Sequence, residues 1–480
     1  MSPNVPFRIR PRNHLIERFG DRVRWAMQNL EPHPKRNAKI HSLRELWSAL
    51  TDLGDLGLTE KTWKRSVSPK NQKPIPDAIL QALLQIFPDA PEDVLLAPRF
   101  SDFQIHALPI IAARKRWQDA VYFLAKHRDL LASVGKVYHA IVDDDPKFPV
   151  ITKPGWILRT PVELTEHSEM PIFDPFVSEP PARRLENLNV DFIQLRIAMM
   201  KRGRNLFNGD SYRTLDIKPK AAGLDLTFGP TKYFQIVNTC EAIAAELADF
   251  VKNNPNRTPS GLELRGPPEA VFDFKNRSTY AVIACLLFIK NYSVNIYSKS
   301  RYRDQFVLHE RGDDTVESQN TIAVVPAGGH QPIAVNFGDR REVALWRSAV
   351  REFCEELFNK EEAAILRRHG ESFLDLPEVK PYVDALFRSG AARVYLMGVG
   401  LDPVTTKCEF MMAIVVDWKK ASRSMELKIE ENYEGTVSFH DLTKRHLFEE
   451  ATKPRKGKPL YPSSKACLLL GHRHFDFLMK

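Results

Sequence analysis

Three glutamates lie close together between Arg351 and Glu356, where this 480-residue chain reads R-E-F-C-E-E. The hydrophobic residues around them predict an amphipathic helix, on which Glu352, Glu355 and Glu356 follow the i, i+3, i+4 spacing and share one face. Carboxylates this close repel one another. A hard divalent cation such as Mg²⁺ relieves the repulsion, because it prefers carboxylate oxygens and keeps waters that substrate phosphates can replace. A solvated acidic helix face is the alternative interpretation.

The segment before this helix supplies further chemistry. Residues 325–329 read V-P-A-G-G, and Glu342 follows before the helix begins. A proline and glycine run, then a glutamate, then R-E-U-x-E-E, with U apolar, resembles the signature of the Nudix hydrolase superfamily, which forms a loop, a helix and a loop. The resemblance covers about 325–360 directly and 275–480 more loosely.

The sequence departs from that signature at three places. More residues separate Gly329 from Glu342 than the pattern allows, which implies an insertion, and Glu342 precedes Arg351 by one residue too many. Phe358 and Asn359 also stand where the family has a glycine and an apolar residue. The glycine normally ends the helix in a left-handed conformation. Asn359 can adopt that conformation or cap a following helix.

The resemblance implies a Mg²⁺ or Mn²⁺ site. Its metal ligands would be the three helix carboxylates, which would also carry catalysis, with one upstream glutamate as a further ligand: Glu352, Glu355, Glu356 and Glu342. Arg351 would hold the loop by pairing with a carboxylate, and Gly328 and Gly329 would shape that loop. Such enzymes cleave a diphosphate that joins a nucleoside to another group, and the metal activates water and neutralises phosphate charge. The general base is left unassigned.

Apolar runs around the helix predict strands of a mixed sheet. We expect these strands at 280–289, 304–311, 321–325, 392–399, 410–416 and 466–470. The second of them is expected at an edge of the sheet. Together with the carboxylate helix they predict an α+β fold, in which helices flank a mixed sheet in the C-terminal part of the chain.

The chain is long enough for several domains. We expect four parts: a helical domain at 1–95, a helical segment with a proline-rich connector at 96–175, an α/β accessory lobe at 176–274 and the Nudix-like domain at 275–480. In the accessory lobe, residues 224–228 predict a strand and 229–231 the start of a helix. Arg213, Lys232 and Tyr233 are candidates for contacting a nucleotide, with surface packing as the alternative for each.

Positive charge gathers in the first 75 residues of a chain whose net charge is +9, as expected of a polyanion-binding region. Residues 42–50 and 59–67 predict two helices joined by a short turn. The pattern resembles the phage-repressor type of all-α helix-turn-helix bundle, whose second helix enters the DNA major groove. Lys61, Lys64 and Arg65 would then face double-stranded DNA. A structural or protein-docking bundle fits the pattern equally well.

Two functional hypotheses follow. In the first, the chain is a metal-dependent pyrophosphohydrolase that acts on a nucleoside diphosphate-linked substrate and is directed to DNA or a partner by its N-terminal domain. In the second, it is a DNA-binding transcriptional regulator whose Nudix-like domain senses a nucleotide metabolite with little or no catalysis. A homodimer is expected if the N-terminal domain acts as repressors do. The scattered cysteines predict reduced packing residues in a cytoplasmic protein, and no apolar run predicts a membrane span.

Overall fold

The structure is a computed structural model. It describes residues 107–168, 170–180, 184–185, 190–193, 196, 208–292, 303–311, 321–332, 340–358, 373–422, 435–455 and 457–480. The predicted helix-turn-helix, with Lys61, Lys64 and Arg65, lies outside the described residues, as does Asn359. Both remain predictions.

The chain divides into two compact units. The larger holds 116–191, 209–365 and 372–480, and the smaller holds 1–115, 192–208 and 366–371. Most of the smaller unit lies outside the described residues, and the account below concerns the larger unit. The predicted four-part division of the chain stays a prediction.

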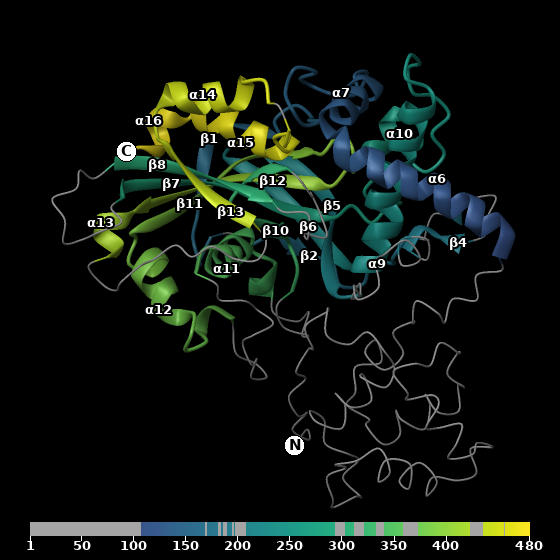
Figure 1. Ribbon diagram of the computed structural model, residues 1–480. Coiled ribbons are helices and arrows are strands. Elements are labelled where there is room, and N and C mark those ends of the chain that lie inside the picture. Colours follow the sequence, from purple (N-terminus) through teal and green to yellow (C-terminus); the bar gives the residue numbers. More distant parts are fainter. Residues whose placement is uncertain are drawn as a thin grey trace, which may run out of the picture. The chain divides into compact units, whose positions relative to one another are not determined.

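A large mixed sheet runs through the larger unit (Figure 1). Its strands are β1 (Ile157–Leu164), β7 (Ala281–Tyr292), β8 (Arg303–Arg311), β9 (Ile322–Val324), β10 (Ala327–Gly329), β11 (Ala392–Leu401), β12 (Cys408–Asp417) and β13 (Gly435–Asp441). The order is β1-β11-β12-β7-β8-β13, with β10 beside β7 and β9 beside β8. β12 and β7 are parallel, and the other pairs in this sheet are antiparallel. The mixed sheet expected from the sequence is confirmed.

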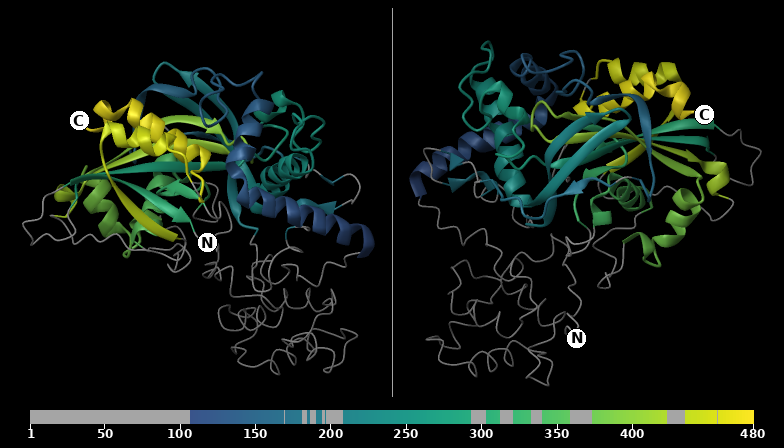
Figure 2. Two further views of the ribbon diagram at one scale, coloured as in Figure 1. Left: turned by 45° about the horizontal axis from the view of Figure 1, so that its top comes forward. Right: turned by 180° about the vertical axis from the view of Figure 1, so that it is seen from behind.

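Helices cover both faces of this sheet. The helices in the described part of the chain, including those beside the sheet, are α6 (Ala107–Lys126), α7 (Arg128–Tyr138), α9 (Tyr233–Ile236), α10 (Ala242–Asn253), α11 (Leu345–Phe358), α12 (Lys380–Val383), α13 (Trp418–Ala421), α14 (Lys444–Thr452), α15 (Pro462–Arg473) and α16 (Phe475–Leu478). Short 3-10 or π turns are η1 (Val237–Glu241), η2 (Pro268–Phe272), η3 (Arg340–Val343), η5 (Phe373–Asp375) and η6 (Asp384–Arg388). Figures 1 and 2 show α14 and α15 on one face, and α11 and α12 on the other.

The central strand β7 explains why both faces need cover. Its side chains alternate between two cores: Cys285 and Leu287 belong to the core that contains Phe353 of α11, and Leu286 and Phe288 to the core on the α15 side. Period-2 alternation sends successive side chains to opposite faces. A strand that is buried on both faces therefore reads as a continuous apolar run.

Two smaller sheets complete the larger unit. One has the order β2-β6-β5, and the other pairs β3 with β4. Their strands are β2 (Ile172–Phe173), β3 (Arg184–Leu185), β4 (Val190–Asp191), β5 (Asp210–Lys220) and β6 (Gly223–Lys232). β5 and β6 form an antiparallel hairpin, and an isolated bridge from Arg213 to Tyr280 connects β5 to the residue before β7.

Three sequence predictions were wrong. Residues 466–470 lie in helix α15, which begins with Pro462 at a position that suits proline; a short apolar run does not separate a buried strand from a buried helix. Residues 304–311 form β8, which is not an edge strand, because β7 and β13 both pair with it. Residues 229–231 continue strand β6 rather than starting a helix, since pairing with β5 extends to Lys232.

Two carboxyl groups, those of Asp402 and Glu409, are buried at the turn between β11 and β12. Asp402 is fully buried, and its Oδ1 accepts hydrogen bonds from the backbone N–H groups of Val404 and Thr405. Glu409, at the start of β12, is also buried. Burial, followed by the nearby Asp402 carboxylate, raises the pKa of Glu409 from an ordinary 4.5 to about 8, against the opposing effect of Lys407. Glu409 is therefore protonated in the folded protein at neutral pH.

This shift predicts how stability depends on pH. An unfolded glutamate loses its proton near pH 4.5, whereas folded Glu409 keeps it until about pH 8, so the free energy of unfolding falls as the pH rises between these values. Glu409→Gln should flatten this dependence. At pH 8 the free energy of unfolding of the variant should exceed that of the wild type by at least about 1.4 kcal/mol, the equivalent of one pKa unit. Urea unfolding at pH 5, 6.5 and 8 measures the effect, with the exposed Glu163→Gln as control. Parallel pH profiles for wild type and Glu409→Gln would contradict this account.

Candidate functional site

Helix α11 carries the predicted carboxylates against the sheet. Glu352 and Glu356 are buried, with 8% and 6% of their surface exposed, and Glu355 is half-buried. The interpretation of this helix as a solvated acidic face is therefore wrong for Glu352 and Glu356. A buried carboxylate needs hydrogen bonds or positive charge around it. The surroundings of α11 provide both.

Strand β10 contacts the carboxylates of Glu352 and Glu356. The backbone N–H of Ala327 donates to Glu356 Oε2 at 3.1 Å. At the next residue, a Cβ on Gly328 would overlap the carboxylate of Glu352. A side chain at position 328 would therefore displace the carboxylate of Glu352, and glycine lets the strand approach it closely. Two carboxylates four residues apart on α11 thus reach adjacent residues of β10.

The next two residues, Gly329 and His330, also contact α11. The carbonyl oxygen of Gly329 accepts from Arg351 Nη2 at 2.8 Å, and His330 Nδ1 lies 2.8 Å from Ser348 Oγ. A Cβ on Gly329 would overlap the hydroxyl of Tyr280, which explains the second glycine. Residues 327–330 therefore run antiparallel to residues 348–356 of α11, and each of the four contacts one residue of the helix. We call this contact the strand–helix interface.

A buried arginine balances charge at this interface. Arg351 is fully buried, and its Nη2 lies 2.6 Å from Glu352 Oε1. Burial acts to lower the pKa of Arg351, but the carboxylates of Glu352 and Glu355 outweigh it, and the pKa is raised. The guanidinium is therefore charged. The expected pairing of Arg351 with a carboxylate, and its hold on the glycine loop, are both present.

Two more arginines lie close to Glu342 and Glu356. Arg347 pairs with Glu342 at 2.9 Å, and both side chains are buried. Arg311 Nη2 lies 3.9 Å from Glu356 Oε1. The structure therefore places Glu342 in an ion pair with Arg347, and its role as a further metal ligand stays a prediction.

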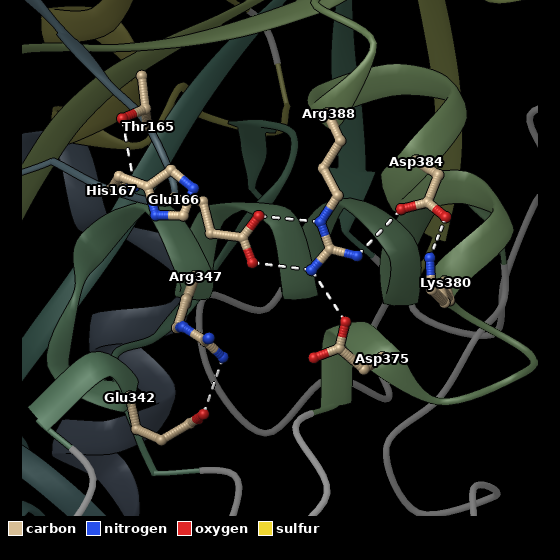
Figure 3. A network of polar contacts seen from close by, with 9 residues as sticks. All are labelled: Thr165, Glu166, His167, Glu342, Arg347, Asp375, Lys380, Asp384 and Arg388. Atoms are coloured by element: carbon tan, nitrogen blue, oxygen red, sulfur yellow. Dashed lines mark hydrogen bonds and ion pairs between the residues drawn. The ribbon is translucent and has the colours of Figure 1, made fainter.

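The Glu342–Arg347 pair lies beside a larger surface network. Figure 3 shows Arg388 between three carboxylates, those of Glu166, Asp375 and Asp384. The hydrogen bonds that Arg388 donates to these carboxylates raise its pKa, the one to Glu166 most strongly. The network joins η6 to the segment after β1. It is partly exposed to solvent, so its contribution to stability is small.

The carboxylates of α11 do not form a closed metal cage, but their number suits an ion that is also bound by waters and phosphates. Among the described residues, no group of three or more His, Cys, Asp or Glu side chains is arranged to hold a metal ion. A preformed protein cage is therefore not part of the described structure. Mg²⁺, however, is usually bound by one or two carboxylates, with waters and substrate phosphates completing its shell. Glu352 and Glu356, which reach adjacent residues of β10, fit that second mode.

The three accessory candidates differ in their surroundings. Arg213 is fully buried, and its Nη2 donates to the carbonyl oxygen of Ser178 at 2.6 Å. Lys232 forms an ion pair with Asp210 at 2.7 Å, and Tyr233 is the first residue of α9. Arg213 is therefore packed in the interior, not on the surface as the alternative had it. Contact of Lys232 or Tyr233 with a nucleotide stays a prediction.

The interface also contains His330, Ser348 and Tyr280, which were not predicted from the sequence. The signals were present but not distinctive: His330 directly follows V-P-A-G-G, and Ser348 lies one helical turn before Glu352. All five cysteines are buried and free, as expected of packing residues.

Comparison with known proteins found no family model and no curated protein that matches this chain. In the part of the chain that the structure describes, every helix is too short or too polar to span a lipid bilayer.

Proposed function

We propose that this chain is a metal-dependent Nudix-type pyrophosphohydrolase that acts on a nucleoside diphosphate-linked substrate. The observation that supports the proposal is the strand–helix interface. There, the carboxylates of Glu352 and Glu356 reach a glycine-containing strand at the border of a mixed sheet. The resemblance implies a loop in contact with a carboxylate-bearing helix, and this contact supports the proposal.

Glu352, Glu355 and Glu356 would hold Mg²⁺ or Mn²⁺ together with waters and substrate phosphates, because the carboxylates do not form a cage by themselves. The bound ion would supply charge neutralisation at the phosphate oxygens and a lower pKa for the attacking water. Ala327 N–H fixes one oxygen of Glu356, which orients that carboxylate. Arg351 fixes Glu352 in the same way and limits the repulsion between the carboxylates. Gly328 keeps the approach to Glu352 free of a side chain.

A second candidate function has its own supporting observation. Arg311, Arg347 and Arg351 form ion pairs with Glu356, Glu342 and Glu352, which lowers the repulsion between the glutamates without an ion. That arrangement suits a regulator whose Nudix-like domain binds a nucleotide with little or no hydrolysis. The altered loops around the helix and the basic N-terminal region support the same alternative.

A substrate panel separates the two. With Mg²⁺ or Mn²⁺, the purified protein should release a nucleoside monophosphate from at least one of ADP-ribose, NAD, dinucleoside polyphosphates and nucleoside triphosphates, detected by liquid chromatography. Without metal, release should stop. Nucleotide binding without release would reject the enzyme and support the regulator.

The regulator also predicts specific DNA binding. Fluorescence anisotropy should then show tight, salt-sensitive binding to fragments that flank its own gene, weakened when Lys61, Lys64 and Arg65 are all replaced by alanine. Equal affinity for random duplex would reduce this to non-specific charge attraction.

A further inference from the structure

His330 joins three parts of the larger unit. Its backbone N–H donates to the carbonyl oxygen of Ala281 at 2.9 Å, and its own carbonyl oxygen accepts from the N–H of Tyr212 at 3.1 Å. Its ring is fully buried, with Nδ1 2.8 Å from Ser348 Oγ on α11. His330 therefore contacts β5, the residue that begins β7, and the helix that bears the carboxylates.

Two aromatic rings hold the imidazole in place. The ring centroid of Tyr212, on β5, lies 4.7 Å from that of His330, and the centroid of Phe228, on β6, lies 4.8 Å away. Both aromatic side chains are buried. Aromatic pairs at this separation have preferred geometries, so the β5–β6 hairpin restricts the orientation of the imidazole.

The partner of this imidazole occupies a sensitive position. Ser348 is buried on α11, one helical turn before Glu352, on the face that contacts β10. The other polar contacts of the interface, at Arg351 and Glu356, lie farther along the same helix. A hydrogen bond at Ser348 thus fixes the position of α11 at the end opposite Glu356. Small displacements of groups that act on a substrate are costly in rate.

We infer that His330 is a positioning residue for the carboxylates of α11, and that it couples the β5–β6 hairpin to them through Tyr212 and Phe228. This inference rests on the proposed function. It assigns the accessory hairpin a role in the same site. His330 acts through Ser348 and the helix, not by contact with substrate.

The role does not involve a proton on His330. Burial, followed by the charge of Arg351, lowers the pKa of His330 to about 3. The imidazole is therefore neutral at any pH at which the enzyme is assayed. The pH profile of kcat should keep its shape when His330 is replaced, whereas loss of a general base would change it.

The test uses full-length protein, with Mn²⁺ alone as the binding probe, followed by electron paramagnetic resonance. His330→Ala should weaken Mn²⁺ binding and lower kcat by about 10- to 100-fold, the usual effect of losing a group that orients a metal ligand. KM should change less. His330→Asn, whose amide can still hydrogen-bond Ser348, should recover part of both losses. Ser348→Ala removes only the hydroxyl and should act in the same direction with a smaller effect on folding.

Two further variants serve as control and coupling test. His474 is also buried, on the α15 side of the sheet, and burial lowers its pKa as well. His474→Ala should lower the melting temperature without weakening Mn²⁺ binding. Phe228→Leu should weaken Mn²⁺ binding in the wild type but add little in the His330→Ala background.

Distinct results overturn distinct claims. If the wild type binds Mn²⁺ and releases product, but His330→Ala matches the wild type or His474→Ala, the positioning role is wrong. Failure of His330→Asn to recover either loss also rejects it. Additive effects of Phe228→Leu and His330→Ala reject the coupling. A wild type that neither binds Mn²⁺ nor releases product rejects the proposed function, and the inference with it.

Discussion

Replacement of Glu356 by glutamine should abolish most of the hydrolysis while leaving the fold intact. The glutamine side chain can still accept the hydrogen bond from Ala327 N–H, which is 3.1 Å long in the wild type. What it loses is the negative charge that a divalent ion requires. We expect kcat to fall by roughly a hundredfold or more, since even the hydrogen-bond partners of metal ligands contribute 10- to 100-fold.

The measurement is steady-state product release at saturating metal, together with the melting temperature. Glu355→Gln should behave like Glu356→Gln, because Glu355 occupies the same helix face and is only half-buried. Glu449→Gln, on the exposed surface of α14, is the matched control and should be active. Hydrolysis that survives both Glu355→Gln and Glu356→Gln would remove these residues from the metal assignment.

Replacement of Arg351 by alanine should cause a large loss of stability. The guanidinium is fully buried, lies 2.6 Å from Glu352 Oε1 and donates to the carbonyl oxygen of Gly329. Removing one partner of a buried ion pair costs about 3–5 kcal/mol, because the other charge stays in a low-dielectric environment. The free energy of unfolding from urea titration should fall by that amount.

The matched control is Arg388→Ala. Arg388 also forms several ion pairs, but these are partly exposed to solvent (Figure 3). Its loss should cost about 1 kcal/mol or less, because solvent screens such pairs. Adding Glu352→Gln to Arg351→Ala should restore part of the lost stability by removing the buried charge. Equal losses for Arg351→Ala and Arg388→Ala would contradict the account of the interface.

Local features of the site could be predicted from the sequence. The spacing of Glu352, Glu355 and Glu356 predicted a helix and a shared face, because both depend on residues within a few positions of each other. The pairing of Arg351 with a carboxylate was implied by the Nudix resemblance, and its partner is the next residue, Glu352. Strands with long apolar runs, such as β7 and β12, were predicted for the same reason: burial on both faces leaves a continuous signal.

Long-range contacts could not be predicted in this way. The strand–helix interface joins residues 327–330 to residues 348–356, which are not neighbours in the sequence. The approach of Arg311 to Glu356 depends on where β8 lies in the sheet, and β8 gains its outer neighbour β13 from more than a hundred residues away. These contacts decide how much of the carboxylate charge is already balanced before any ion binds.

The central claim is that the strand–helix interface binds a divalent ion for use on a pyrophosphate. Anomalous diffraction at the manganese edge tests it most directly, with crystals soaked in Mn²⁺ and a non-hydrolysable ADP-ribose analogue. The account predicts an anomalous peak within coordination distance of Glu352 or Glu356, close to Gly328 and to a phosphate oxygen of the analogue. A bound analogue with no manganese peak at these carboxylates would contradict it.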